Sequence, residues 1–211
     1  MRRLRLQCTI LIILACLSII SVGFASWVTT TDSISTTIDG TIIVDDVATN
    51  TEYLSSNLIP FNYYKTKFVD EENNLTDTGT MTAILTLTEK GMNLFKNDSS
   101  MEIQLNLYCK YLSLLNDSTN ILMNVSAELI TGDSSLLSIT SKSYNDTDYN
   151  LVLNIQNINT LAEISIKVYY VFTINNQTNT IRGYQYFYNN VYPKLINNEL
   201  TFKLGTKFTG K

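Results

Sequence analysis

Apolar and polar residues alternate with a period of two along most of this 211-residue chain, and no other feature constrains its fold as strongly. The clearest case is the segment 101–109, in which every second residue from Met101 to Cys109 is apolar and the residues between them are polar. Successive side chains of a strand point to opposite faces, so this pattern predicts a strand with one buried face. The alternation recurs in segments 36–44, 81–87, 121–129, 151–155, 164–174 and 200–204. Strands with one solvent-exposed face are typical of antiparallel sheets.

Short polar stretches separate the predicted strands. They are rich in asparagine and aspartate, which tolerate turn conformations and bond to their own backbone. These stretches are 73–74, 97–100, 116–118, 132–134 and 145–146. Segments 89–95 and 187–197 are predicted to be short helices, and Pro193 limits the length of the second. The sequence therefore predicts an all-β fold, a single antiparallel β-sandwich of jelly-roll or immunoglobulin type spanning residues 27–211.

The first 26 residues have a different pattern, in which three arginines precede a long apolar stretch with no charge between Arg5 and Asp32. This arrangement predicts a secretory signal peptide, or a membrane anchor helix if the segment is retained. Gly23 and Ala25 are the small residues that a signal peptidase requires for cleavage before Ser26. The sequence thus predicts an exported protein, secreted or at the cell surface, whose partners before processing are the membrane and a signal peptidase.

Two residues of this region leave alternatives open. Trp27 lies where an aromatic side chain would anchor a retained helix at the membrane interface. Cys16 follows three apolar or small residues, so it is read either as a site of lipidation or as a small hydrophobic residue of the apolar stretch.

The segment 21–28, followed by Ile38-Asp39-Gly40-Thr41-Ile42, resembles the leader of a group of Gram-positive exported proteins that includes the biofilm-fibre protein TasA and camelysin. The resemblance covers roughly the first 45 residues. It implies processing by a specialised signal peptidase, secretion, and a β-sandwich of jelly-roll type. For some members of the group it also implies assembly into fibres of the extracellular matrix.

Composition excludes several classes of function. Three of the 15 basic residues lie in the leader, which leaves 12 against 19 acidic residues, and this negative surface repels nucleic acids. The chain has no histidine, which excludes histidine-dependent triads and histidine-ligated zinc. Cys109 is the single cysteine beyond the leader and lies on an apolar strand face, which predicts a buried, unreactive thiol. We therefore expect no enzyme activity, no cofactor and no metal site.

The acidic pairs and clusters are interpreted as solvated loop charges. Asp45-Asp46 and Asp70-Glu71-Glu72 are the densest groups, and nothing in the sequence brings them together as a pair of glycosidase carboxylates or a calcium site. Segment 145–150 has acidic residues in a calcium-loop order, but it lacks the glycine and the distal glutamate of an EF-hand.

Tyr184, Tyr186 and Tyr188 are spaced to occupy one face of a strand. Tyrosine has a broad apolar body and a polar tip, so the three form a candidate surface for a glycan or peptide. The other interpretation is packing against a neighbouring strand.

Together these features predict an exported structural or adhesive protein of the cell surface or extracellular matrix. Its partners would be other copies or matrix components. The segment from Trp27 to Val47, with Ile38, Ile42 and Val44 on one face, is the candidate strand for addition to a sheet edge of another copy. The alternative is an extracellular binding module that uses the tyrosine-rich surface, and a hydrolase with paired acids is a third hypothesis.

Overall fold

The computed structural model describes residues 40–41, 53–175 and 181–210. The chain divides into two units, Met1–Thr37 and Ile38–Lys211, and every described residue belongs to the second. Within the described part, no helix has the length and apolar character needed to cross a bilayer. The predicted leader and cleavage region and most of the candidate assembly strand lie outside the described residues, including Gly23, Ala25, Ser26, Ile38, Ile42 and Val44.

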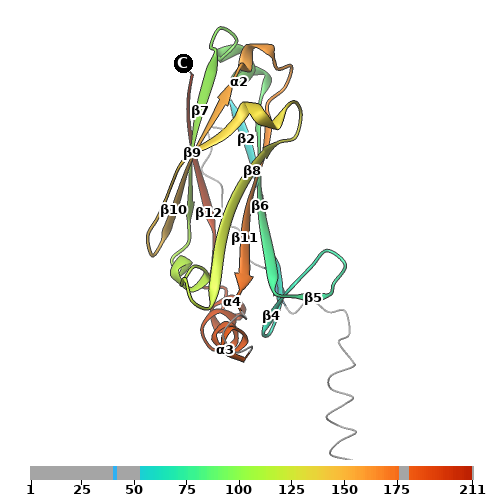
Figure 1. Ribbon diagram of the computed structural model, residues 1–211, viewed down its shortest axis with the longest axis vertical. Helices are drawn as coiled ribbons and strands as arrows, with labels where there is room; N and C mark the ends of the chain where they lie inside the picture. The colour runs from blue at the N-terminus through green and yellow to red at the C-terminus, as the bar shows by residue number, and fades with distance from the viewer. Residues whose placement is uncertain (1–39, 42–52, 176–180, 211) are drawn as a thin grey trace, which may run out of the picture. The chain divides into compact units, whose positions relative to one another are not determined.

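Two four-stranded antiparallel sheets face each other and form a β-sandwich (Figure 1). Sheet I has the order β2 (Leu54–Ile59), β6 (Thr78–Leu87), β11 (Ser165–Ile174) and β8 (Ile121–Leu129). Sheet II has the order β12 (Lys203–Gly210), β7 (Ser100–Tyr108), β10 (Asp148–Gln156) and β9 (Leu137–Tyr144). The inward side chains of both sheets belong to one apolar core, in which Tyr149 of sheet II meets Tyr170 of sheet I with ring centroids 6.2 Å apart. The predicted antiparallel β-sandwich is confirmed.

Most connections between the sandwich strands pass from one sheet to the other. Among the described strands, the two exceptions are β2 to β6 and the hairpin of β9 and β10, whose strands are neighbours in their sheets. Strand neighbours are therefore mostly far apart in sequence, as with β12 and β7 or β6 and β11.

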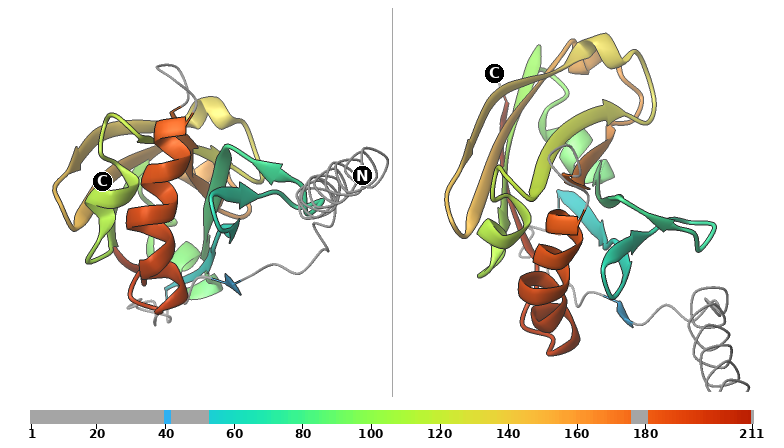
Figure 2. Two further views of the ribbon diagram at one scale, coloured as in Figure 1. Left: turned by 90° about the horizontal axis from the view of Figure 1, so that it is seen from below. Right: turned by 60° about the horizontal axis from the view of Figure 1, so that its bottom comes forward.

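A smaller sheet, which we call the finger, extends from one end of sheet I (Figures 1 and 2). It consists of β1 (Gly40–Thr41), β3 (Asn62–Tyr64), β4 (Lys67–Val69) and β5 (Leu75–Thr76), in that order. Phe68 of β4 lies directly on β6, where a Cβ atom at Gly79 would be 2.3 Å from the Phe68 ring. Glycine is required at this position because no side chain fits under the ring.

Helices cover the two ends of the sandwich. The helix α2 (Glu89–Leu94) matches the predicted segment, and its first turn is capped by the Thr88 hydroxyl, which accepts a hydrogen bond from the Gly91 N–H at 3.2 Å. Short 3-10 helices η1 (Leu112–Leu115), η2 (Ser134–Leu136) and η3 (Ile158–Thr160) occupy connections. At the opposite end, α3 (Ile181–Tyr186), the π-helical turn η4 (Phe187–Val191) and α4 (Tyr192–Ile196) form one continuous helix, which we call the cap helix (Figure 2).

The prediction that Tyr184, Tyr186 and Tyr188 share a strand face is wrong, because all three lie on the cap helix. Phe187, Val191 and Leu195 are buried at a spacing of four residues, which is the period of a helix. Burial of this stripe, with Phe187 against Phe68 at a ring distance of 5.1 Å, outweighs the β preference of the tyrosines.

Other differences are smaller. The last strand runs over 203–210 and not 200–204. The sequence did not predict β2, β9 or the finger strands β3, β4 and β5, whereas β1 lies within the predicted strand 36–44. Strand β9 lacks the alternation because most of its residues are exposed on both faces. The polar stretches predicted as turns lie between the strands, and Asn73, Ser118 and Gly132 have positive φ angles there.

Candidate functional site

The three tyrosines predicted as one surface contact different parts of the molecule. The Tyr184 hydroxyl donates to Asp77 at 2.8 Å, and Lys67 lies both beside this carboxylate and over the Tyr184 ring, 4.8 Å from its centroid. Tyr184 therefore holds the cap helix against the finger. Tyr188 is 48% exposed and stacks on Tyr192 with ring centroids 5.6 Å apart.

Tyr186 contacts the loop that precedes β8. Burial, followed by the charge of Asp117 and a hydrogen bond to it, raises the pKa of the Tyr186 hydroxyl to about 12. Burial by itself raises the pKa of the Asp117 carboxyl, but the Asn120 side chain and the backbone N–H groups of Asn120, Ile121 and Thr119 donate to it, and these bonds hold its pKa below the usual range. This carboxylate organises the turn on which the helix packs.

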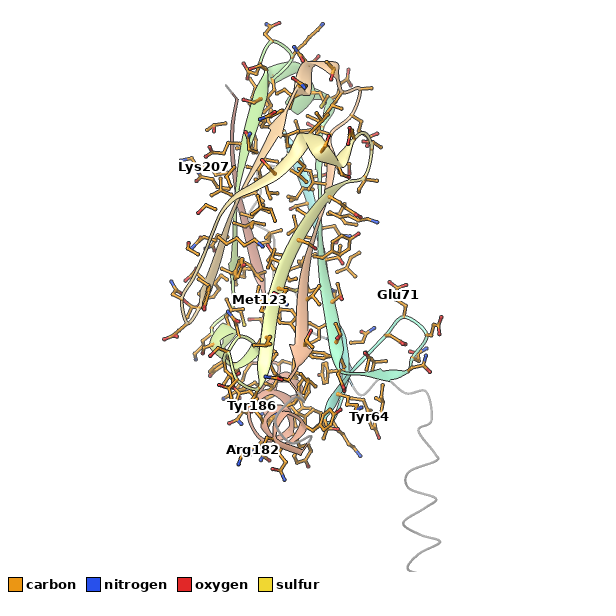
Figure 3. All side chains as sticks on the ribbon, in the orientation of Figure 1. Tyr64, Glu71, Met123, Arg182, Tyr186 and Lys207 are labelled. Carbon is orange, nitrogen blue, oxygen red and sulfur yellow. The ribbon has the colours of Figure 1, made fainter. Side chains whose placement is uncertain are left out.

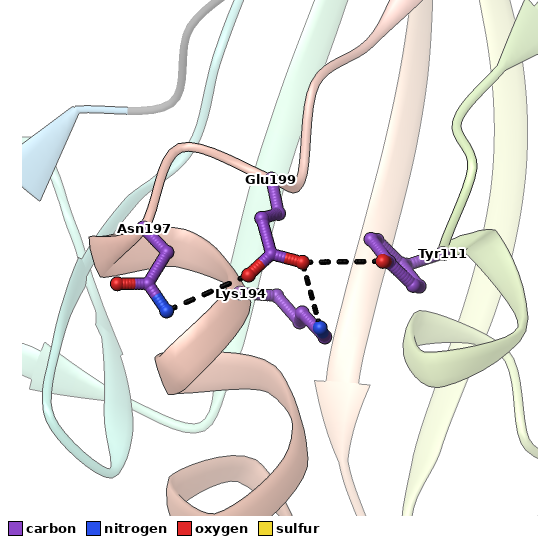
Figure 4. A network of polar contacts seen from close by, with 4 residues as sticks. All are labelled: Tyr111, Lys194, Asn197 and Glu199. Atoms are coloured by element: carbon purple, nitrogen blue, oxygen red, sulfur yellow. Dashed lines mark hydrogen bonds and ion pairs between the residues drawn. The ribbon is translucent and has the colours of Figure 1, made fainter.

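A second polar network fixes the end of the cap helix (Figure 4). Glu199 accepts from Lys194 at 2.7 Å and from the Tyr111 hydroxyl at 3.1 Å, and the Lys194 ammonium group lies 4.6 Å from the centroid of the Tyr111 ring. Hydrogen bonding to Lys194, the largest influence, lowers the pKa of the Glu199 carboxyl. Both networks join elements of the fold, so most of the cap helix serves packing.

The acidic groups that the sequence singled out are loop residues. Asp70 bonds to the backbone N–H groups of Glu72 and Asn74 at 3.0 and 2.8 Å within the loop of the finger, and Glu71 lies at its exposed tip (Figure 3). Asn145 accepts from the N–H groups of Thr147 and Asp148 and forms the turn between β9 and β10. Among the described residues, no group of acidic or cysteine side chains has the arrangement of a metal site. Asp45 and Asp46 lie outside them.

Cys109 is fully buried and has no disulfide partner. Burial raises the pKa of its thiol to about 11, although a hydrogen bond from the Tyr111 backbone acts in the opposite direction. A thiol with this pKa stays protonated at neutral pH, as expected for a packing residue.

At each of the two sides of the sandwich, an edge strand of sheet I lies next to an edge strand of sheet II. The two sides differ in how these edge strands contact each other. At one side, β8 and β9 are joined by the Lys142 ammonium group on β9, which donates to the Val125 carbonyl on β8 at 2.7 Å. A lysine across a strand edge is a common protection against further pairing.

At the other side, which we call the β2–β12 side, the edge strands approach each other at both ends. Tyr53 lies next to Phe208 with ring centroids 6.4 Å apart, and Phe61 lies next to Phe202 at 6.2 Å. These contacts place the start of β2 opposite the end of β12 and the end of β2 opposite the start of β12. Within the described part of the chain, β2 has no sheet partner besides β6, and β12 has none besides β7.

Midway between the aromatic contacts, each edge strand turns a hydroxyl group inward. Ser56 lies between Leu54 and Leu58 on the inner face of β2, and Thr206 lies between Leu204 and Phe208 on β12. The oxygen atoms of both side chains are buried and have no hydrogen-bond partner among the described residues. An unpaired buried hydroxyl lowers the free energy of unfolding by roughly 1–3 kcal/mol. The interior at this side therefore carries unfavourable polar groups at positions where a closed core would have apolar ones.

Comparison with known proteins does not place the chain in a family. No family model and no curated protein matches it significantly. Among solved structures, it is similar to a chain described as the unique CBM3 of Hungateiclostridium clariflavum, with 14% identity over 60% of this chain and 75% of that one. The TM-score is 0.26, a similarity too low to assign a family, a ligand or an activity.

Proposed function

We propose that this is an exported structural or adhesive protein of the cell surface or extracellular matrix, and that copies assemble by strand addition at the β2–β12 side. An extended segment that pairs with a sheet edge gains a ladder of main-chain hydrogen bonds. The asymmetry of the two sides supports the proposal, because one edge pair is bridged by Lys142 and the other carries buried, unpaired hydroxyls.

The candidate for the added strand is the segment from Trp27 to Val47 of a second copy. It is rich in serine and threonine, whose hydroxyls are suitable partners for Ser56 and Thr206. Two residues of this segment, Gly40 and Thr41, pair with β3 at the edge of the finger, so this part of the chain is compatible with an extended conformation and edge pairing.

Sedimentation and electron microscopy of the chain that begins at Ser26 test this proposal. We expect oligomers or fibres, and we expect a variant that lacks residues 27–39 to stay monomeric. A wild-type chain that remains monomeric over the full concentration range would count against strand addition.

Two exposed asparagines on edge strands provide a matched pair of variants for locating the contact. Asn57 lies on β2 and Asn124 lies on β8. A lysine on an edge strand discourages pairing with another strand. Asn57→Lys should therefore reduce assembly while Asn124→Lys leaves it unchanged. Equal effects of the two variants would contradict assembly at the β2–β12 side.

A further inference from the structure

A shallow groove crosses the outer face of sheet II, on the solvent side of β12, β7 and β10. Its volume is about 450 Å³. Figure 3 shows Lys207 on this outer side of the sheet. The side chains and backbone that line the groove include Gln104, Asn106, Asn150, Val152, Gly205 and Lys207. None of these six residues belongs to the inward core, whereas Leu105, Leu151 and Thr206, which alternate with them along the strands and also border the groove, have inward side chains.

The amide groups in the groove are held in place by their neighbours. Asn106 donates from its amide nitrogen to the side-chain oxygens of Asn150 at 2.8 Å and Asp148 at 3.1 Å, and Gln104 donates to Glu102 at 2.9 Å. In each of these carboxamide groups, the bonds use either the nitrogen or the oxygen and leave the other atom available. The side-chain oxygens of Asn106 and Gln104 and the amide nitrogen of Asn150 have no partner among the described residues. The groove thus presents fixed acceptors and a fixed donor.

Gly205 creates the hollow in the middle of the groove. In the sheet it pairs with Asn106, which in turn pairs with Asn150. A Cβ atom at Gly205 would meet nothing closer than 3.8 Å, so the space above the glycine is open. A side chain would fit there without strain, and the absence of one leaves the amides accessible.

Tyr108 extends the same face toward one end of the sheet. It follows Asn106 by two residues on β7, so its side chain points to the same side, and it is 38% exposed. From Gln104 to Tyr108 the strand rises about 14 Å at roughly 3.4 Å per residue. The face therefore offers amides along its length and an aromatic ring at one end.

We propose that this groove binds a neutral polysaccharide. A sugar hydroxyl both donates and accepts, as a carboxamide does, and the apolar face of a sugar ring packs on an aromatic ring. One cation and no carboxylate line the groove, and the carboxylates of Glu102 and Asp148 and the exposed Lys203, which pairs with Tyr108, flank it. Two lysines are thus matched by two carboxylates, and this balance favours a neutral ligand over a polyanion or a cation. This inference rests on the proposed function and gives the surface protein a matrix partner on the outer face of sheet II, whereas the proposed strand addition uses the free edge of β2 and β12.

Affinity electrophoresis of the full chain in mild detergent tests the inference, with cellulose derivatives, xylan, β-1,3-glucan and dextran as neutral probes and polygalacturonate as the acidic one. We expect at least one neutral polymer to retard the protein and polygalacturonate not to do so. Gly205→Leu, which fills the hollow, should weaken binding about tenfold or more. The matched control is Thr209→Leu, at an outward position of the same strand beyond the groove, and it should bind as the wild type does.

Asn150→Asp separates loss of binding from loss of folding. It keeps the oxygen that accepts from Asn106 and replaces the unpartnered amide nitrogen with an oxygen. We expect it to melt at the wild-type temperature and to bind several-fold more weakly. The inference is overturned if no neutral polymer binds, if binding survives both substitutions, or if the acidic polymer binds equally well. Asn150 lies on β10, an inner strand of sheet II, so assembly of Asn150→Asp should remain normal in sedimentation and failure of this site and failure of the proposed assembly are distinguishable.

Discussion

Removal of either buried hydroxyl at the β2–β12 side should stabilise the monomer. Thr206→Val replaces the hydroxyl with a methyl group of similar size, and Ser56→Ala removes the oxygen alone. In the unfolded chain these hydroxyls bond to water, whereas in the folded chain their oxygens are buried without a partner. Such a group costs roughly 1–3 kcal/mol, of which we expect about 1 kcal/mol to be recovered by each substitution.

Neither hydroxyl has a hydrogen-bond partner among the described residues, so the two residues share none and we expect the two substitutions to be additive. The double variant would then gain about 2 kcal/mol in the free energy of unfolding. With a urea m-value of about 2 kcal/mol per M, the unfolding midpoint rises by about 0.5 M for each single variant and about 1 M for the double variant. The measurement is made at a concentration at which sedimentation shows a monomer.

Thr86→Val provides the matched control on sheet I. Its hydroxyl is bonded to that of Ser165 at 2.8 Å, and Ser165 is buried. Loss of this bond leaves a buried hydroxyl unpaired, so we expect a loss of about 1–2 kcal/mol. A decrease for Thr206→Val similar to that for Thr86→Val would refute the reasoning. If the two hydroxyls are partners of an incoming strand, Ser56→Ala and Thr206→Val should also weaken assembly while they stabilise the monomer.

Two further predictions concern titratable groups. The pKa of Asp117 is lowered in the folded state, so its contribution to stability is present above about pH 4 and is lost as the pH falls through the lowered value. Asp117→Asn should therefore be less stable than the wild type at pH 7 in urea unfolding, with a difference that shrinks in acid, and a pH-independent difference would contradict this. Cys109, with a pKa of about 11 and no exposure, should react with a thiol reagent at pH 7 only as fast as the protein opens. Rapid labelling of the native protein would show that the site is accessible.

The strands with strict alternation could be predicted from the sequence because their pattern is local. Segment 121–129 corresponds to β8 without a shift, and 101–109 differs from β7 by one residue at each end. Each of these strands buries one face against the other sheet, so every second residue had to be apolar. Strand β9 is an edge with little buried surface, and no such requirement acts on its residues.

The cap helix shows where a local pattern was misleading. The residues from Tyr184 to Tyr188 satisfy a strand period, while Phe187, Val191 and Leu195 satisfy a helix period. Which period prevails depends on the surface against which the segment packs. Here the helical set of apolar side chains packs on Phe68 of the finger and on the end of the sandwich. The four-residue spacing was present in the sequence, but its partner became visible only in the folded chain.

The class of fold, the polar outer faces and the absence of histidine chemistry follow from residue types and from a period of two, so they can be predicted without a structure. The β2–β12 side and the groove of sheet II arise only when the chain folds. Ser56 and Thr206 are 150 positions apart, and Asn106, Asn150 and Gly205 come from three separate strands. Strand pairing across distant parts of the chain sets these neighbours, and no local pattern encodes it.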